Sequence, residues 1–530
     1  MVTPIVTGGG AVPGVPVGRR RELLVVAAAA ACSSLAVLVS TRHGIGVTHT
    51  DSVAYLTMVD DVAAGRVPYP SGNGVSFSPT HFPPGWSLVA ALIVALVPGI
   101  DALAAARALN VVLAGLLPIA VYVAVRSRST RPTWIPPLMA VVVATSYPLM
   151  ELASRALSEA QFLVLMVIAL LAIERVARVR SMASLFLASV LVAALTLTRF
   201  VGIAALLPLC LAVFAITPRW VQRLTRLGFV ALITVVPTLV WYLLEPGSSE
   251  NSHLKGDQRA GLEQLLHSVR EAGVTLVRGD RLGDAVHFLT GLALLAAPIV
   301  AILVTSRSIA PSLPWRRRTS DFVASRELGP WVWFVLAYSA MVVVQRWLID
   351  REVIARYWLP FWIVTVVVVG RCLIDLAALE RPTCRRAVRL ASASLLALAA
   401  YNLAAVAVTV RSNARDGVTL NAVRYQESET LDALADADLG VIYTDNTYLV
   451  EFQMYARGVL VPIERLSCQV PAIDALVEEL ESATRGGTPP AIALLRRCRR
   501  EGAFVDELLD RLDGAIVVRD EELGIVIRPQ

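Results

Sequence analysis

The sequence predicts an all-α polytopic membrane protein of about eleven transmembrane helices, followed by a small C-terminal α/β domain. Of the 530 residues, 56% are hydrophobic and the mean hydropathy is +0.64, which is too apolar for a soluble chain of this length. Runs such as 182–198 and 227–244 are long enough to cross a bilayer, since about 20 apolar residues span its hydrocarbon core. A β-barrel would show short alternating segments instead.

The apolar runs place the helices. We expect spans at 23–40, 102–125, 134–150, 158–174, 182–198, 201–217, 227–244, 285–305, 330–347, 357–374 and 391–410. Residues 86–100 are apolar but short, and they end in Pro-Gly, so we interpret them as interfacial or re-entrant. Whether they span decides which side of the membrane every later loop faces.

Arginine indicates the orientation. The net charge is +6, and nearly all of the basic residues are arginine, with one lysine, Lys255. Arginine-rich loops occur at 126–131, 174–180, 218–226, 315–318 and 381–389. With the N-terminus in the cytoplasm these loops all fall inside, as the positive-inside rule requires, so the charge reflects topology rather than nucleic-acid binding. The near absence of lysine is typical of a GC-rich bacterial genome, and we expect a multi-pass protein of the bacterial plasma membrane.

Three parts follow along the chain. Residues 1–22 begin with a Gly- and Pro-rich stretch and predict a disordered cytoplasmic N-terminus. Residues 23–410 form the transmembrane domain, with a long first extracytoplasmic loop at 41–101 that carries a helix at 52–64, closed by Gly65. Residues 411–530 are expected outside the cell.

Short apolar segments in the C-terminal part read as strands. They lie at 439–444, 458–463, 491–495, 514–519 and 523–529, with helices expected at 471–485 and 501–512. This alternation predicts a small α/β domain. Cys468 and Cys498 both lie in it, and a disulfide between them is left open.

Asp51 is the first candidate for chemistry. It lies at the outer end of the first helix and begins the loop helix, with Tyr55 one turn further on the same face. A helix N-cap is the simpler interpretation, because Asp is among the best capping residues.

Glu159 and Arg199 are the next candidates. Glu159 lies in SRALSEAQF (154–162), at the outer mouth of two helices, where Ser158 could instead cap the second helix and Glu159 suit its dipole. Arg199, in LTRFVG, lies between two apolar runs, where an unpaired charge is costly and usually functional.

Three further arginines, Arg346, Arg351 and Arg356, cluster in QRWLIDREVIARYWLP. Interfacial snorkelling with neighbouring acids is the alternative for any one of them. His81 precedes a Pro-Pro-Gly turn, and a structural role is the simpler interpretation there. The few, scattered histidines do not suggest a zinc site or a Ser-His-Asp triad.

Four motifs together resemble a known family. DSVAYLTMVDDVAAGRVPYP (51–70) with HFPPGWSLVAAL (81–92) resembles the first extracytoplasmic loop of the GT-C superfamily of integral-membrane glycosyltransferases, which includes protein mannosyltransferases and the lipid A aminoarabinose transferase. SRALSEAQF resembles the second acidic loop of that family, and LTRFVGIA and ARYWLPFW resemble its later arginine motifs. The first loop departs from the family in having a single aspartate at 51 rather than Asp-x-Asp.

The resemblance implies an inverting transferase that moves a sugar from a polyprenyl-phosphate donor to a glycan, lipid or protein acceptor of the cell envelope. Asp51 and Glu159 would be catalytic. The substrate would be bound by Tyr55, His81, Arg199, Arg346, Arg351 and Arg356. No cofactor is required, but a divalent cation (Mg²⁺ or Mn²⁺) on Asp51 and Glu159 stays open.

Other functions remain open from the residues alone. A transporter or flippase predicts ionisable residues at mid-membrane and inverted repeats. A polysaccharide polymerase would share the outer arginines without the first-loop motif. A degenerate relative that only binds is a third alternative.

Overall fold

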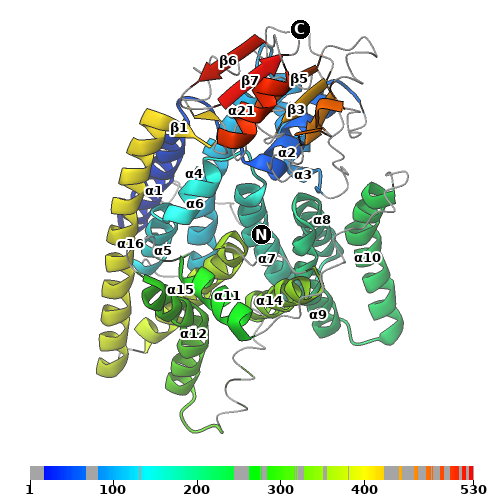
Figure 1. The fold of residues 1–530 in the computed structure, drawn as a ribbon. Helices are drawn as coiled ribbons and strands as arrows, with labels where there is room; N and C mark the ends of the chain where they lie inside the picture. Colours follow the sequence, from blue (N-terminus) through cyan, green and yellow to red (C-terminus); the bar gives the residue numbers. More distant parts are fainter. Residues whose placement is uncertain are drawn as a thin grey trace, which may run out of the picture.

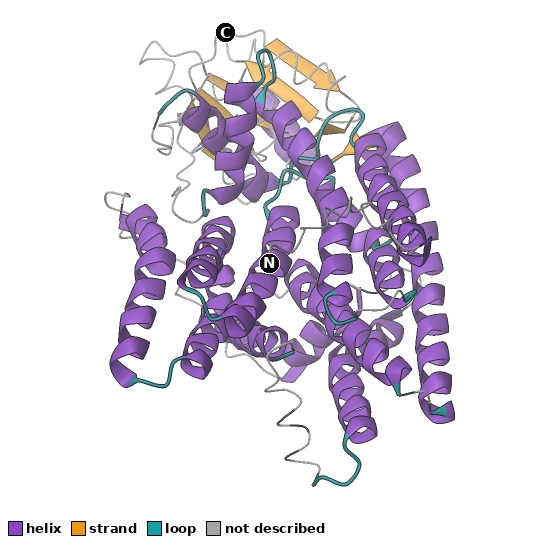
Figure 2. Cartoon of the chain, turned by 180° about the vertical axis from the view of Figure 1, so that it is seen from behind, coloured by secondary structure: helices purple, strands orange, loops and turns teal. Residues whose placement is uncertain are grey.

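The protein is a helical bundle with a β-sheet at one end, as seen in a computed structural model (Figure 1). The structure describes residues 17–66, 82–129, 133–243, 262–274, 276, 283–314, 317, 319, 321, 328–349, 355–379, 381–419, 421–422, 441–444, 459–462, 473–474, 476–478, 480, 490–494, 502–512, 516–520 and 524–528. Seen from behind, the strands again gather at this end, which we call the sheet end (Figure 2).

The first half of the bundle holds these helices: α1 (Val17–Ser40), α2 (His49–Ala63), α3 (Gly85–Leu96), α4 (Ala102–Arg126), α5 (Ile135–Ala144), α6 (Tyr147–Ala153), α7 (Glu159–Val179), α8 (Met182–Thr198), the 3₁₀-helix η2 (Phe200–Ala205) and α9 (Leu206–Ile216). The second half holds α10 (Trp220–Leu243), α11 (Leu262–Val274), α12 (Gly283–Ile309), α14 (Gly329–Ile349), the 3₁₀-helix η4 (Ala355–Trp358), α15 (Leu359–Ala378) and α16 (Pro382–Asp416). Each expected span coincides with one of these helices or with a consecutive pair of them.

The expected helix at 134–150 is wrong in one respect, because it is broken into α5 and α6. The two helices meet at a bend of 53° around Ser146. Pro148 explains the break: its ring clashes with the carbonyl four residues earlier, at Ala144, and it has no amide hydrogen to donate there. Ala144 is the last residue of α5.

Six helices of the described part are long and apolar enough to cross a membrane, or seven if α5 and α6 count as one bent span. They make the chain a multi-pass membrane protein. The six are Gly18–Ser40, Ala102–Arg126, Trp220–Trp241, Asp284–Ile309, Arg356–Ala378 and Pro382–Asp416. Helix α3 has 12 residues, or about 18 Å, and is too short to cross alone.

The five expected strands of the C-terminal part are present. They are β3 (Val441–Thr444), β4 (Val459–Pro462), β5 (Pro490–Leu494), β6 (Ile516–Asp520) and β7 (Gly524–Arg528), in the order β4-β3-β5-β7-β6. Strand β3 pairs in parallel with β4 and β5, whereas β7 is antiparallel to β5 and β6. Helix α21 (Gly502–Arg511) contributes Phe504 and Leu508 to the core beneath the sheet.

A short backbone ladder ties three distant parts together at the sheet end. Gly46 donates its amide to the carbonyl of Ser154 (2.8 Å) and accepts from the amide of Ala156 (2.7 Å). The next residue, Val47, bridges to Thr419, just beyond α16. Only glycine fits at 46, since a Cβ there would lie 2.4 Å from Val418 Cγ1. The ladder fixes the start of α2 beside the segment that leads into α7.

Candidate active site

Four charged side chains meet at the sheet end of the bundle, and each comes from a different part of the chain. They are Asp51 of α2, Glu159 of α7, Arg199 at the end of α8 and Arg356 of η4. Asp51 and Arg356 are 305 positions apart in sequence, so only the tertiary fold brings them together. The four residues that the sequence singled out on separate motifs therefore form one cluster.

Asp51 lies in the first turn of α2 and is not its N-cap. The helix starts at His49, and Thr48 has the extended backbone of the capping position. The Asp51 carboxylate instead accepts from Nη1 of Arg356, with Oδ2 at 2.7 Å. An acid in the first turn also suits the positive end of the helix dipole. The capping alternative is therefore wrong for this residue.

Glu159 is the first residue of α7 and is buried, with 4% of its surface exposed. Its Oε1 lies 2.5 Å from Nη1 of Arg199 and 3.6 Å from Nη1 of Arg356. Neither carboxylate oxygen has a partner with hydrogen-bond geometry in the described residues. The Glu159 carboxylate is thus held by its attraction to the two arginines, and its oxygens can still accept hydrogen bonds from a ligand.

Tyr55 supports the start of α7. Its hydroxyl is hydrogen-bonded to Oγ of Ser158 at 2.9 Å, so the serine does not cap α7 as the alternative interpretation suggested. Its ring lies against Phe82 and Trp86, with centroids 5.5 Å and 5.6 Å away. Burial raises the pKa of Tyr55 to about 12, which keeps the phenol neutral next to the charged cluster.

Arg199 lies in an extended turn between α8 and η2. The turn closes through the amide of Gly202, which donates to the carbonyl of Arg199 at 2.7 Å. A Cβ on Gly202 would lie 2.6 Å from the carbonyl of Leu195, so the return of the chain against α8 needs glycine here. Burial has the largest single effect on the pKa of Arg199 and lowers it, but Glu159 together with the neighbouring tyrosines more than offsets burial, so the pKa is raised.

Arg356 lies on η4, directly before α15. The guanidinium carbons of Arg356 and Arg199 lie 5.4 Å and 5.9 Å from the ring centroid of Tyr357, so one aromatic ring stabilises both cations. Tyr338 of α14 donates to the carbonyl of Tyr357 at 2.8 Å and fixes this segment. Tyr357 was not expected at the site from the sequence, although it directly follows Arg356 in ARYWLPFW.

One donor of the cluster is free to bind a ligand. Nε of Arg356 is buried and has no hydrogen-bond partner in the described part of the chain. Because Nη1 of the same side chain already contacts Asp51, a phosphate or hydroxyl bound at Nε would lie within reach of the Asp51 carboxylate.

A divalent cation fits this arrangement poorly. Mg²⁺ requires near-octahedral oxygen ligands. Here the guanidinium of Arg356 lies between Asp51 and Glu159, where a shared metal ion would lie. In the part of the chain that the structure describes, no group of three or more His, Cys, Asp or Glu side chains is placed to hold a metal ion.

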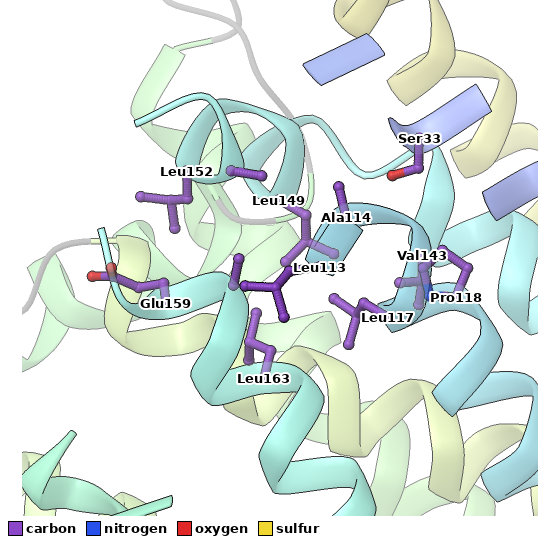
Figure 3. Close-up of a pocket in the computed structure, with 12 residues that line it drawn as sticks. Ser33, Leu113, Ala114, Leu117, Pro118, Val143, Leu149, Leu152, Glu159 and Leu163 are labelled. Atoms are coloured by element: carbon purple, nitrogen blue, oxygen red, sulfur yellow. The ribbon is translucent and has the colours of Figure 1, made fainter. Parts of the chain in front are cut away.

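An apolar pocket opens beside Glu159. It lies between α1, α4, α5, α6 and α7, is partly open to the outside, and has room for little more than one water molecule. Figure 3 shows Glu159 at one side, with leucines such as Leu113, Leu117 and Leu163 lining the interior. The pocket thus joins a charged cluster to an apolar cavity.

Other expected residues fall outside what the structure describes. These are His81, Arg351, the side chain of Arg346, and both Cys468 and Cys498. Their roles stay predictions.

Comparisons with known proteins concern the fold. No family model and no curated protein matches the sequence. Among solved structures, ArnT from Cupriavidus metallidurans in the apo state matches with a TM-score of 0.58 and 15% identity, over 97% of this chain and 99% of that chain. The same protein bound to undecaprenyl phosphate matches with a TM-score of 0.57 and 13% identity, over 96% of this chain and 98% of that chain. The chain therefore has the fold of ArnT, which is the GT-C-like fold that the sequence motifs predict.

Proposed function

We propose that this protein transfers a sugar from a polyprenyl-phosphate donor to an acceptor of the cell envelope, at the outer face of the membrane. The observation that carries the proposal is the convergence of Asp51 and Glu159 with Arg199 and Arg356 in one cluster. A base and cations for a phosphate are the groups that this chemistry needs. The ArnT-like fold supports the same reaction class.

The arginines take the donor phosphate. Charge-assisted hydrogen bonds to phosphate are about twice as strong as neutral ones. Arg356 offers its free Nε, and Arg199 lies close by, because both arginines contact Oε1 of Glu159 and the ring of Tyr357. Both cations also stabilise the charge that develops on the leaving phosphate, which is where preorganised charge has its largest effect.

Asp51 acts as the general base. Its Oδ2 is engaged by Arg356, so Oδ1 is the atom that takes the proton of the acceptor hydroxyl. The acceptor oxygen forms a bond to the anomeric carbon as the bond from that carbon to the phosphate oxygen breaks, and polyprenyl phosphate leaves with the electron pair. A single in-line displacement of this kind inverts the anomeric centre. Glu159 accepts a hydroxyl of sugar or acceptor, because its oxygens lack hydrogen-bond partners.

A lipid-borne substrate is supported by the likeness to ArnT rather than by the pocket. The pocket at Glu159 has a leucine-rich lining but is too small for an isoprenoid chain in this conformation. One structure of ArnT holds undecaprenyl phosphate, a carrier of this class. We propose that the donor of this protein uses a carrier of the same kind and that its head group faces the four charged residues.

The topology completes the proposal. We propose about eleven spans with the N-terminus in the cytoplasm, supported by the arginine-rich loops at 126–131 and 381–389. The cluster and the C-terminal sheet then lie outside the cytoplasm. No nucleotide-sugar site is needed there, because the donor arrives already activated.

Asp51→Asn tests the assignment of the base. Transfer from a synthetic polyprenyl-phosphate sugar should fall by roughly 10²–10⁴-fold, the usual worth of a general base, whereas donor binding should persist. Asp61→Asn is the matched control, since Asp61 lies on the same helix and also pairs with an arginine, Arg66, at 2.9 Å. Full transfer by Asp51→Asn, or an equal loss in both variants, would refute the assignment.

A further inference from the structure

A second ion pair lies between the helices that carry Glu159 and Arg356. Glu174 of α7 accepts from Nη1 of Arg371 of α15, and both side chains are about 1% exposed. The charges of 174–180 fit the positive-inside rule, which gives neither Glu174 nor Arg371 a role, and the proposed reaction uses neither residue.

The two ion pairs have the same spacing on both helices. Glu174 follows Glu159 by 15 residues, and Arg371 follows Arg356 by 15 residues. Because α7 and α15 both run away from the cluster, equal spacing places the pairs about 22 Å apart along two parallel elements. The contact between Glu159 and Arg356 and the contact between Glu174 and Arg371 therefore share one register.

Arg371 is held from a third helix as well. Its Nε and Nη2 donate to the carbonyl of Ala124 at 3.0 Å and 2.7 Å, and Nη2 also reaches Oγ of Ser127 at 3.1 Å. Ala124 lies in the last turn of α4, where carbonyls lack partners within the helix and the dipole favours a cation. Three directed bonds leave this guanidinium little freedom to shift.

Glu174 is fixed in the same way. It accepts from Nε1 of Trp331 of α14, and its Oε2 accepts from Arg178 at 3.0 Å. The ring of Trp331 in turn lies under the guanidinium of Arg371, with 5.0 Å from Cζ to the ring centroid. Helices α4, α7, α14 and α15 are thus joined at one point.

Between Arg356 and Arg371 the chain has no charged side chain that could hold α15 in position. Residues 357–370 read YWLPFWIVTVVVVG, and the facing part of α7, 160–173, reads AQFLVLMVIALLAI. Apolar contacts of this kind tolerate small shifts far better than hydrogen bonds, which weaken steeply with angle and distance. A buried ion pair adds little net stability compared with apolar packing, and fixing a register is its best-attested use.

We propose that Glu174 and Arg371 are positioning residues: they fix the register of α15 against α7 and so hold Arg356 opposite Glu159 and Asp51. The effect on transfer rests on the proposed function, whereas the effect on the structure does not.

Hydrogen–deuterium exchange of the purified full-length protein tests the structural part. Glu174→Gln should raise exchange at 355–358, about 22 Å away, by roughly threefold or more. Arg371→Lys keeps the positive charge but loses the planar guanidinium with its several donors. It should raise exchange at 355–358 by a smaller factor. Glu22→Gln is the matched control: Glu22 is also buried, and it accepts from Tyr122 at 3.1 Å and from the amide of Thr133 at 2.6 Å, but it joins α1 to α4. Unchanged exchange at 355–358 in both Glu174→Gln and Arg371→Lys would overturn the proposal. An equal rise in Glu22→Gln would overturn it as well.

A double-mutant cycle tests the link to the reaction. Glu174→Gln should lower kcat/KM for transfer about tenfold alone, but by less than about twofold when Arg356 is already replaced by Gln, because the two residues act through one contact. Glu22→Gln should cost the same factor in both backgrounds. If Glu174→Gln lowers kcat/KM by the same factor in both backgrounds, Glu174 is not a positioning residue for Arg356. If the wild-type protein transfers no sugar, the proposed function fails and the exchange experiment still decides the register.

Discussion

Replacing Arg356 is the sharpest test of the cluster, because this side chain contacts both acids. Its Nη1 lies 2.7 Å from Oδ2 of Asp51 and 3.6 Å from Oε1 of Glu159. Its side chain is 23% exposed and that of Asp51 is 28% exposed, so the contact is partly screened by solvent. We therefore take the lower part of the range for a hydrogen bond between charged groups, about 2 kcal/mol.

The longer contact adds less. At 3.6 Å, the pair with Glu159 contributes about 1 kcal/mol on the scale of partly exposed ion pairs. This total of about 3 kcal/mol concerns the stability of the cluster, because both contacts exist in the free protein. The rate depends instead on the hydrogen bond that Nε of Arg356 gives to the donor phosphate, and a hydrogen bond to a charged group is worth about 1.5–3 kcal/mol, or roughly 10- to 10²-fold. Arg356→Gln should therefore lower kcat/KM by roughly 10- to 10²-fold. Arg356→Lys keeps the positive charge without the planar guanidinium and should lower kcat/KM about tenfold.

The assay is the initial rate of transfer from a synthetic polyprenyl-phosphate sugar by purified protein, with thermal unfolding to confirm that each variant folds. Arg107→Gln is the control. Arg107 also bridges two elements through two hydrogen bonds, to Oγ1 of Thr41 (3.1 Å) and the carbonyl of Leu38 (3.0 Å), but it touches no acid of the cluster. A folded Arg356→Gln protein with kcat/KM within about twofold of wild type would refute the role of this residue.

Two more predictions concern Tyr55 and Gly202. Burial raises the pKa of Tyr55 from 10.0 to about 12, so its contribution to stability is complete below about pH 10 and is lost as the pH rises towards 12; Tyr55→Phe should flatten the fall of the unfolding free energy over that window, as measured by thermal melts. A slope that Tyr55→Phe leaves unchanged would contradict this. Gly202→Ala would place a Cβ 2.6 Å from the carbonyl of Leu195, and should lower stability by about 1–3 kcal/mol and slow transfer by displacing Arg199. Gly228→Ala, where a Cβ meets nothing within 4 Å, should be neutral or stabilising, and equal melting shifts for the two variants would count against the argument.

Much of the fold could be predicted, because the local pattern of hydropathy and turn residues indicates where helices and strands begin and end. The helix in the first loop was expected at 52–64 and is found at His49–Ala63, with Gly65 at φ +70° in the left-handed region after it. The five strands were also expected within a few residues. The break at Ser146 was missed, although Pro148 signals it, because the apolar run continues across the break.

The candidate site was predictable only in part. Asp51, Glu159, Arg199 and Arg356 could be chosen because each is a charge at the end of an apolar run and each lies in a segment that resembles a GT-C motif. Their pairing could not be predicted, because single-sequence patterns carry no information on contacts 305 positions apart. Glu174 escaped notice because the arginine-rich segment 174–180 at a helix end is explained equally well by topology, whereas Arg371 lies inside the expected span 357–374 and was not singled out there. The equal spacing from the outer pair is the signal that could have found them.

The long sequence separation between Asp51 and Arg356 bears on how the protein is made. A ribosome releases α2 and α7 well before it reaches η4, so Glu159 can already pair with Arg199 in the nascent chain while Asp51 still lacks the counter-charge of Arg356. The membrane region completes its polar contacts only when the last third of the chain is inserted. Chains that stop early would leave the Asp51 carboxylate without its arginine, which gives quality-control proteases a physical mark by which unfinished copies differ from finished ones.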